Sequence, residues 1–205
     1  MIEDIISNNG YEYIDLDLPS GTLWSTKNIG ASKSDDSGLY FQWGDTKGYT
    51  ADQVGKEFGQ KKFTWDDYKY EKSSTKYTNP GTKLYLEDDA AHVNMRGSWH
   101  IPSPKQCQEL ISNTDCSWAI SEDGVSGYLF ISKKNESNYI FIPAAGNAWN
   151  GSIDDIGDYG FIWSSMLGTD YDDYGQSLYF ISERDYIVTA GLDRCYGFNI
   201  RGVIG

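Results

Sequence analysis

The sequence predicts an α+β domain whose strands are concentrated in the C-terminal half. Aromatic residues make up 15% of the 205 residues, and 22 are glycine, a combination typical of short strands joined by tight turns. One segment, residues 103–113, carries a strong helix start. Short apolar runs separated by polar turns follow residue 127. A chain of this length can bury the core of a single domain, 1–205, without disulfides.

The N-terminal part is predicted to form strands and turns. Apolar side chains alternate along residues 11–18, and the turn sequence Pro19-Ser-Gly21 ends the run. A second turn at 35–38 precedes the apolar stretch 39–43.

The next block, at about residues 44–80, is polar, rich in Lys and Tyr and poor in aliphatic residues. We interpret it as a long insertion at the surface of the domain, because long segments without periodic structure are usually loops. Its aromatic residues are the expected anchors to the core: Phe58, Phe63, Trp65, Tyr68 and Tyr70.

Two helices follow, at about 87–95 and 103–113. Three acids at 87–89 suit the start of the first helix, where they complement the helix dipole. In the second, Ser103 is the N-cap, Pro104 takes the first helical position and Gln106 completes a capping box.

Apolar periodicity places Cys107 of the second helix in the core, together with Leu110 and Ile111. From residue 127 the chain is predicted to be β, with a hairpin formed by 128–131 and 139–142. Trp163 is assigned to the core. The further strands are expected at 161–163, 177–181, 186–188 and 198–200.

The charge balance limits the partners. A net charge of −13 argues against a nucleic-acid backbone and against an anionic membrane surface, which both require clustered Lys and Arg. No apolar run is long enough for a transmembrane helix, so we expect no membrane insertion. The first ten residues carry Glu3 and Asp4 where a signal peptide needs positive charge.

The three cysteines, Cys107, Cys116 and Cys195, cannot all pair within one chain. Buried free thiols are the first interpretation, and a disulfide between two of them is the second. Arg194 lies beside Cys195 and would lower its thiol pKa, but a single neighbour is a thin reason to expect a nucleophile.

Chemical motifs are weak. The loop containing Asp170, Asp172 and Asp173 approaches a calcium-loop pattern but lacks its required ligands. The cluster Asp154, Asp155 and Asp158 would suit a glycan-acting enzyme, although paired acids alone do not show it. We therefore expect no catalytic residue, no metal and no cofactor.

What remains is a set of aromatic and polar residues within the C-terminal region 147–201. Tyr, Trp, Asn, Asp and Arg together resemble the composition of protein-binding loops, and aromatic faces also suit sugar rings. We expect the segments 149–159, 170–177 and 186–196 to converge on one ligand-binding surface. The predicted contacts are Trp149, Asn150, Tyr159, Tyr171, Asp173, Tyr174, Tyr186, Arg194 and Tyr196.

The order of seven short motifs resembles the Fibrobacter succinogenes major paralogous domain family, which is abundant in gut Bacteroidetes and their phages. The motifs are Tyr13-Ile-Asp-Leu-Asp-Leu-Pro-Ser-Gly-Thr-Leu-Trp24, Tyr40-Phe-Gln-Trp-Gly44, Glu87-Asp-Asp-Ala-Ala91, Gly97-Ser-Trp-His-Ile-Pro102, Ile142-Pro-Ala-Ala-Gly146, Gly160-Phe-Ile-Trp-Ser-Ser165 and Gly197-Phe-Asn-Ile-Arg201.

The resemblance implies a C-type-lectin-like fold, related to that of the formylglycine-generating enzyme. It also extends to the variable proteins of diversity-generating retroelements, and the closest likeness is to phage-encoded members. It implies that the strands at 11–18 and 198–204 pair. The cysteines of the formylglycine-generating site and the calcium-binding motifs of animal lectins have no counterpart here, so neither activity is expected.

The implied function is a non-enzymatic recognition protein of a virion or an extracellular surface, such as a phage receptor-binding or adhesion protein. Its partner would be a host-cell surface protein or glycan, with other virion proteins or copies of itself as further partners. Two alternatives stay open: a glycan-acting enzyme using the Asp cluster, and a bacterial cell-surface adhesin.

Overall fold

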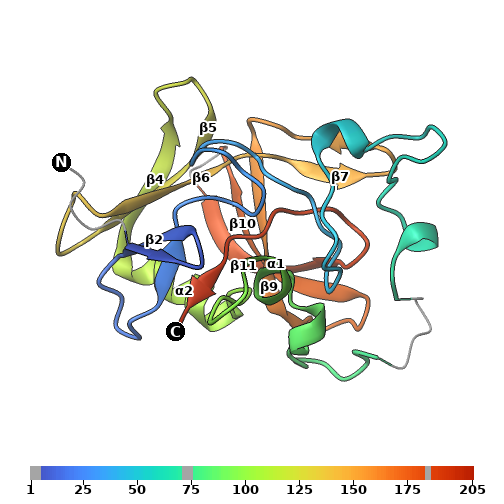
Figure 1. The fold of residues 1–205 in the computed structure, drawn as a ribbon, viewed down its shortest axis with the longest axis horizontal. Helices are drawn as coiled ribbons and strands as arrows, with labels where there is room; N and C mark the ends of the chain where they lie inside the picture. The colour runs from blue at the N-terminus through green and yellow to red at the C-terminus, as the bar shows by residue number, and fades with distance from the viewer. Residues whose placement is uncertain (1–5, 71–75, 183–185) are drawn as a thin grey trace.

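Several small antiparallel sheets and two α-helices make up the part of the chain that the computed structural model describes, residues 6–70, 76–182 and 186–205 (Figure 1). The mixed α+β class is therefore confirmed.

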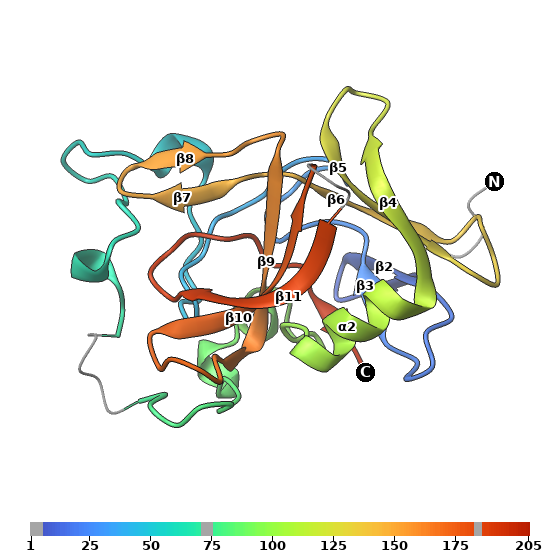
Figure 2. The same ribbon diagram turned by 180° about the vertical axis from the view of Figure 1, so that it is seen from behind.

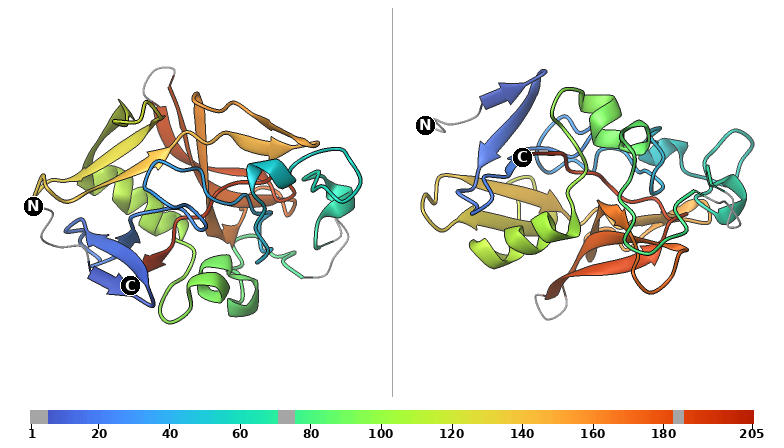
Figure 3. Two further views of the ribbon diagram at one scale, coloured as in Figure 1. Left: turned by 45° about the horizontal axis from the view of Figure 1, so that its top comes forward. Right: turned by 90° about the horizontal axis from the view of Figure 1, so that it is seen from below.

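The first sheet contains both ends of the described chain, in the order β1-β2-β3-β12 (Figure 3). Its strands are β1 (Ile6–Asn8), β2 (Tyr11–Asp15), β3 (Leu23–Ser25) and β12 (Val203–Ile204). The predicted direct pairing of 11–18 with 198–204 is wrong. The chain turns back after β2, so β3 lies between the two strands and pairs Trp24 with Val203.

The helix predictions are confirmed, with one change of boundary. Helix α2 (Pro104–Asn113) has the expected capping box. Helix α1 (Ala90–Met95) begins later than expected, because the Asp89 side chain accepts a hydrogen bond from the His92 N–H and acts as the N-cap. The acidic residues before it belong to a short 3-10 turn, η3 (Leu86–Asp88).

The second sheet has the order β4-β5-β6 and contains the predicted hairpin. Its strands are β4 (Thr114–Ile120), β5 (Ser126–Ser132) and β6 (Tyr139–Pro143). Strand β4 follows α2 directly and was not predicted.

The third sheet, in the order β11-β10-β9, forms the C-terminal half together with the small hairpin β7-β8 (Figure 2). The strands are β7 (Asn147–Trp149), β8 (Ser152–Asp154), β9 (Tyr159–Leu167), β10 (Tyr174–Ile181) and β11 (Tyr186–Asp193). The strands predicted at 177–181 and 186–188 are confirmed, but β10 begins three residues earlier and β11 continues to Asp193. The predicted strand at 198–200 makes only isolated bridges, from Phe198 to Phe41 and from Asn199 to Ile162.

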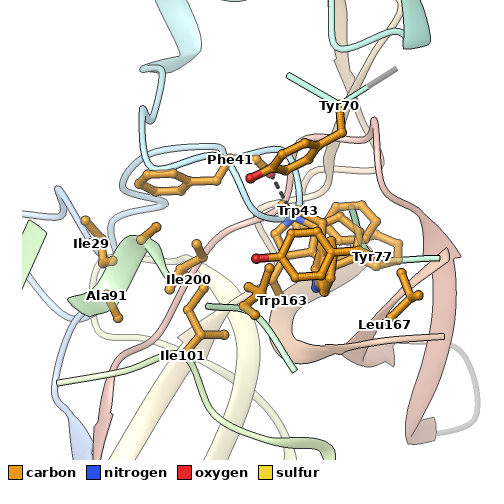
Figure 4. Close-up of a cluster of buried hydrophobic side chains, with 14 of the residues drawn as sticks. Ile29, Phe41, Trp43, Tyr70, Tyr77, Ala91, Ile101, Trp163, Leu167 and Ile200 are labelled. Atoms are coloured by element: carbon orange, nitrogen blue, oxygen red, sulfur yellow. Dashed lines mark hydrogen bonds between the residues drawn. The ribbon is translucent and has the colours of Figure 1, made fainter. Parts of the chain in front are cut away.

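The core is unusually aromatic. Trp163 and Cys107 are fully buried, as predicted. The Trp163 indole N–H donates to the Phe41 carbonyl at 2.7 Å, and the Trp43 indole N–H donates to the Ser164 carbonyl at 2.9 Å. Figure 4 shows Trp43, Tyr77 and Trp163 gathered in this cluster.

In the segment 44–80, the described residues form the short 3-10 turns η1 (Ala51–Gln53) and η2 (Trp65–Asp67) and isolated bridges such as Val54 to Lys61. Residues 71–75 lie outside the described part. Phe63, Tyr68 and Tyr70 are buried as expected anchors, and Trp65 is half-buried. Phe58 is fully exposed, so its expected role as an anchor is wrong.

Candidate binding face

The sheet of β9, β10 and β11 has two chemically different faces. Because side chains alternate along a strand, Leu178 and Phe180 point to one side, where they join Cys107 and Leu110 of α2 in the core. Tyr179 points to the opposite side. It lies in register with Phe161 of β9 and Val188 of β11, so these three side chains share one face.

Tyrosine rings form a row across this second face. The ring centroid of Tyr179 lies 6.0 Å from that of Tyr159 and 6.3 Å from that of Tyr186. Beneath them, the ring of Phe161 stacks at 5.1 Å on that of Tyr179. Each strand of the sheet thus contributes a tyrosine, and a buried phenylalanine supports the row.

Two further rings extend the row toward the hairpin β7-β8. Phe198 stacks on Phe161 at 4.5 Å, and the Tyr196 ring lies 6.1 Å from that of Phe198. The Trp149 ring contacts Tyr196 at 4.7 Å. We call the surface formed by these five partly exposed rings the aromatic face: Trp149, Tyr159, Tyr179, Tyr186 and Tyr196.

Exposure varies along the aromatic face. Tyr186 is 47% exposed, whereas the other four rings are half-buried. Burial raises the pKa of the Tyr179 hydroxyl, and the neighbouring Tyr159 and Tyr186 add to this effect. Burial also raises the pKa of Tyr196. Both hydroxyls are therefore neutral at physiological pH and can donate a hydrogen bond.

Four of the five rings belong to strands, and Tyr196 follows β11 directly, so little conformational freedom remains for a ligand to remove. Asn150 adds an exposed amide next to Trp149. It occupies the β7-β8 turn together with Gly151, and both residues have positive φ angles, as a tight hairpin turn requires. The surface thus offers flat apolar rings, neutral hydroxyls and an amide, groups that bind a sugar ring or a protein surface.

Arg194 is not part of this surface. Its side chain is buried, and the guanidinium carbon lies 5.9 Å from the ring centroid of Trp43, 5.9 Å from that of Trp65 and 5.7 Å from that of Tyr68. Its Nη1 donates to the Tyr77 carbonyl at 3.3 Å. The predicted contact residue is instead a link between the segment 44–80 and the C-terminal sheet.

Tyr171 and Tyr174 form a separate pair, with ring centroids 5.1 Å apart. Tyr174 lies five positions before Tyr179 in β10, so the alternation places it on the opposite side of the sheet. The Asp173 carbonyl accepts a hydrogen bond from the Arg194 N–H at 2.9 Å. Because Tyr174 nevertheless acts on the pKa of Tyr196, the convergence of 170–174 with the other two segments stays a prediction.

The aspartates of the enzyme alternative are engaged separately. Asp154 accepts from the Ser152 hydroxyl at 3.1 Å, and Asp155 accepts from the Asn147 amide at 3.1 Å. The Asp158 carbonyl accepts from the Ser182 N–H. Within the described ranges, no three His, Cys, Asp or Glu side chains are grouped as metal ligands.

Sequence reasoning missed Tyr179, although the signal was present. In the predicted strand 177–181, Leu178 and Phe180 suit the core, so strict alternation turns Tyr179 to the other face. The support from Phe198 could not be foreseen, because it depends on the C-terminal segment crossing β9.

Comparisons with family models, with curated proteins and with solved structures return no match for this chain. Within the described residues, none of the helices has the length and apolar character needed to cross a membrane.

Proposed function

We propose that this protein is a non-enzymatic recognition module that binds a host-cell surface protein or glycan through the aromatic face. The supporting observation is the row of partly exposed rings from Tyr186 to Trp149. Three of these rings come from the sheet β11-β10-β9, and buried Phe161 and Phe198 pack against the row. Rigid Tyr and Trp side chains supply large contact area at low entropic cost, which is why they dominate binding hot spots.

The resemblance to the Fibrobacter succinogenes major paralogous domain family supports a C-type-lectin-like fold and a phage receptor-binding or adhesion role at a virion or extracellular surface. The mixed α+β architecture and the sheet shared by β2 and β12 are compatible with such a fold. A bacterial surface adhesin would bind through the same face. The proposal therefore concerns the aromatic face, whether the protein belongs to a phage particle or to a bacterial surface.

The test compares two tyrosines of equal exposure on different sheets. Fluorescently labelled protein is applied to a panel of whole bacterial cells and immobilised bacterial surface glycans. We expect Tyr186→Ala to weaken the strongest interaction about tenfold or more. Tyr139→Ala is the matched control, because Tyr139 is 46% exposed against 47% for Tyr186 but lies on β6. Equal loss in both variants, or no binding anywhere in the panel, would count against the proposal.

A further inference from the structure

Strand β11 forms an open edge of the third sheet. The sheet order is β11-β10-β9, so β11 pairs on one side only. It lies on the side of the molecule that faces the viewer in Figure 2. With eight residues it is among the longest strands, and of the other strands that end a sheet, β4 has seven residues and β6 has five.

The direction of its backbone groups follows from the neighbouring hydrogen bonds. The Ser182 N–H donates to the Asp158 carbonyl, and the Gly168 N–H donates to the Tyr174 carbonyl, so even-numbered positions of β10 face β9. Odd-numbered positions of β10 therefore face β11 and bond its even-numbered residues. Ile187, Thr189 and Gly191 consequently direct their N–H and C=O groups away from the sheet, where no described residue bonds them.

Natural proteins usually protect such an edge with charged side chains, proline or a covering segment. Residues 186–192 contain neither a charged residue nor proline, and the strand's one charged residue is Asp193 at its C-terminal end. The opposite edge of the same sheet is protected, because the Trp163 N–H of β9 donates to the Asn199 carbonyl at 3.0 Å. An uncharged, unprotected edge in a strongly acidic protein suits a partner strand that is itself uncharged.

We propose that β11 pairs with β11 of a second copy of this chain, antiparallel and centred on Thr189. In this register, Thr189 lies opposite Thr189 of the second copy, and Ile187 lies opposite Gly191 of the second copy. Every outward N–H and C=O group of these three residues is then hydrogen-bonded. Tyr186 then lies opposite Leu192, an aromatic–aliphatic pair of the kind that stabilises sheets. No like charges meet between residues 186 and 192.

The pairing joins two three-stranded sheets into one of six strands. The two-fold axis runs perpendicular to the sheet, so Tyr186 and Val188 of both copies emerge on the same side. The two aromatic faces become neighbours across the dimer axis. The dimer itself does not depend on the proposed function, since it follows from the edge alone.

The first test measures mass against concentration by analytical ultracentrifugation. We expect the 23.1 kDa chain to reach twice its monomer mass as concentration rises. Thr189→Pro should raise the dissociation constant at least about tenfold, because proline removes an outward N–H and leaves the bonds to β10 intact. A chain that stays at 23.1 kDa up to about 1 mM, or a Thr189→Pro variant that dimerises like the wild type, overturns the proposal.

A second variant covers the case in which Thr189→Pro fails to fold. In the proposed register the two Thr189 Cα atoms would lie about 5.5 Å apart, within the range of a disulfide. Thr189→Cys should therefore form a disulfide-linked dimer under mild oxidation. Thr169→Cys, on an exposed loop, is the matched control and should form no disulfide-linked dimer, although its β11 edge can still pair. Equal cross-linking of the two variants would contradict the pairing.

Discussion

The guanidinium of Arg194 lies against the ring of Trp43, 5.9 Å from its centroid, and the Arg194 carbonyl accepts a hydrogen bond from the Trp43 N–H at 3.0 Å. Trp65 and Tyr68 enclose the same guanidinium from the segment 44–80. Ring faces and the Tyr77 carbonyl oxygen thus surround the guanidinium charge.

Arg194→Ala should therefore destabilise the fold rather than only weaken binding. We expect the free energy of unfolding to fall by about 2 to 3 kcal/mol, from lost packing and lost cation–π contacts. Denaturant unfolding measures this. Lys105→Ala, at an exposed position of α2, is the control and should change stability by less than about 0.5 kcal/mol. An equally stable Arg194→Ala variant would mean that the aromatic enclosure does not stabilise the fold.

Trp149 and Tyr196 should be energetically coupled, because their ring centroids lie 4.7 Å apart. A double-mutant cycle with Trp149→Ala and Tyr196→Ala should give a coupling of about 0.5 to 1.5 kcal/mol in thermal or denaturant unfolding. A second cycle with Trp149→Ala and Tyr171→Ala should be additive, since Tyr171 pairs with Tyr174 instead. Additivity in the first cycle would show that the aromatic face is not a connected unit.

Asp88 should make stability sensitive to acid. Its carboxylate is buried and accepts from the Lys69 ammonium at 2.7 Å and from the Tyr77 hydroxyl at 2.6 Å, and it is paired with Lys76. Although burial opposes ionisation, these donors hold the Asp88 pKa well below its ordinary value of 3.8. The stabilisation is thus complete above that ordinary value and is lost as the pH falls toward the pKa of the folded state.

Asp88→Asn is expected to cost about 2 kcal/mol of unfolding free energy at pH 7 and progressively less below pH 4. Urea titrations across this range measure the difference. Asp154→Asn provides the comparison, because that exposed carboxylate bonds only the nearby Ser152 hydroxyl. A pH-independent cost for Asp88→Asn would refute the assignment.

No disulfide joins any two of the three cysteines, which all lie in the described residues, and the thiols should differ in reactivity. Cys107 and Cys195 are fully buried, and burial raises the pKa of the Cys107 thiol to about 12. Cys116, on β4, is half-buried. A chromogenic disulfide reagent at pH 8 should therefore modify Cys116 first, and the other two only at the rate of unfolding. A fast phase that survives Cys116→Ser would contradict this order.

Local signals made part of the fold predictable. Helix α2 follows from Ser103, Pro104 and Gln106, which satisfy the helix start within four residues. The hairpin β5-β6 follows from two apolar runs around a polar turn. Strand β4 was not predicted, because it begins at Thr114 directly after helix α2. No glycine or proline marks the transition from helix to strand.

The residues of the candidate site could be predicted only where the exposure of a side chain does not depend on distant segments of the chain. Tyr159 and Tyr186 were predicted as contacts from their residue type, and they lie at the first positions of β9 and β11. The position of Arg194 could not be read in this way, because its surroundings come from Trp43, Trp65 and Tyr68, far earlier in the chain. Contacts between such distant segments leave no local pattern.

Arg201 is fully buried and reaches two distant segments. Its Nε donates to the Asn28 side chain and its Nη1 to the Ser25 carbonyl, and its Nη2 donates to the Phe141 carbonyl. The adjoining strand β12 pairs with Trp24 through Val203. Until residues 201–204 have been synthesised, the N-terminal sheet lacks strand β12. The Ser25 and Phe141 carbonyls also lack the Arg201 guanidinium that donates hydrogen bonds to them. Final assembly therefore has to wait until this segment has left the ribosome, and a nascent chain stopped before it would display unfinished apolar surface to chaperones.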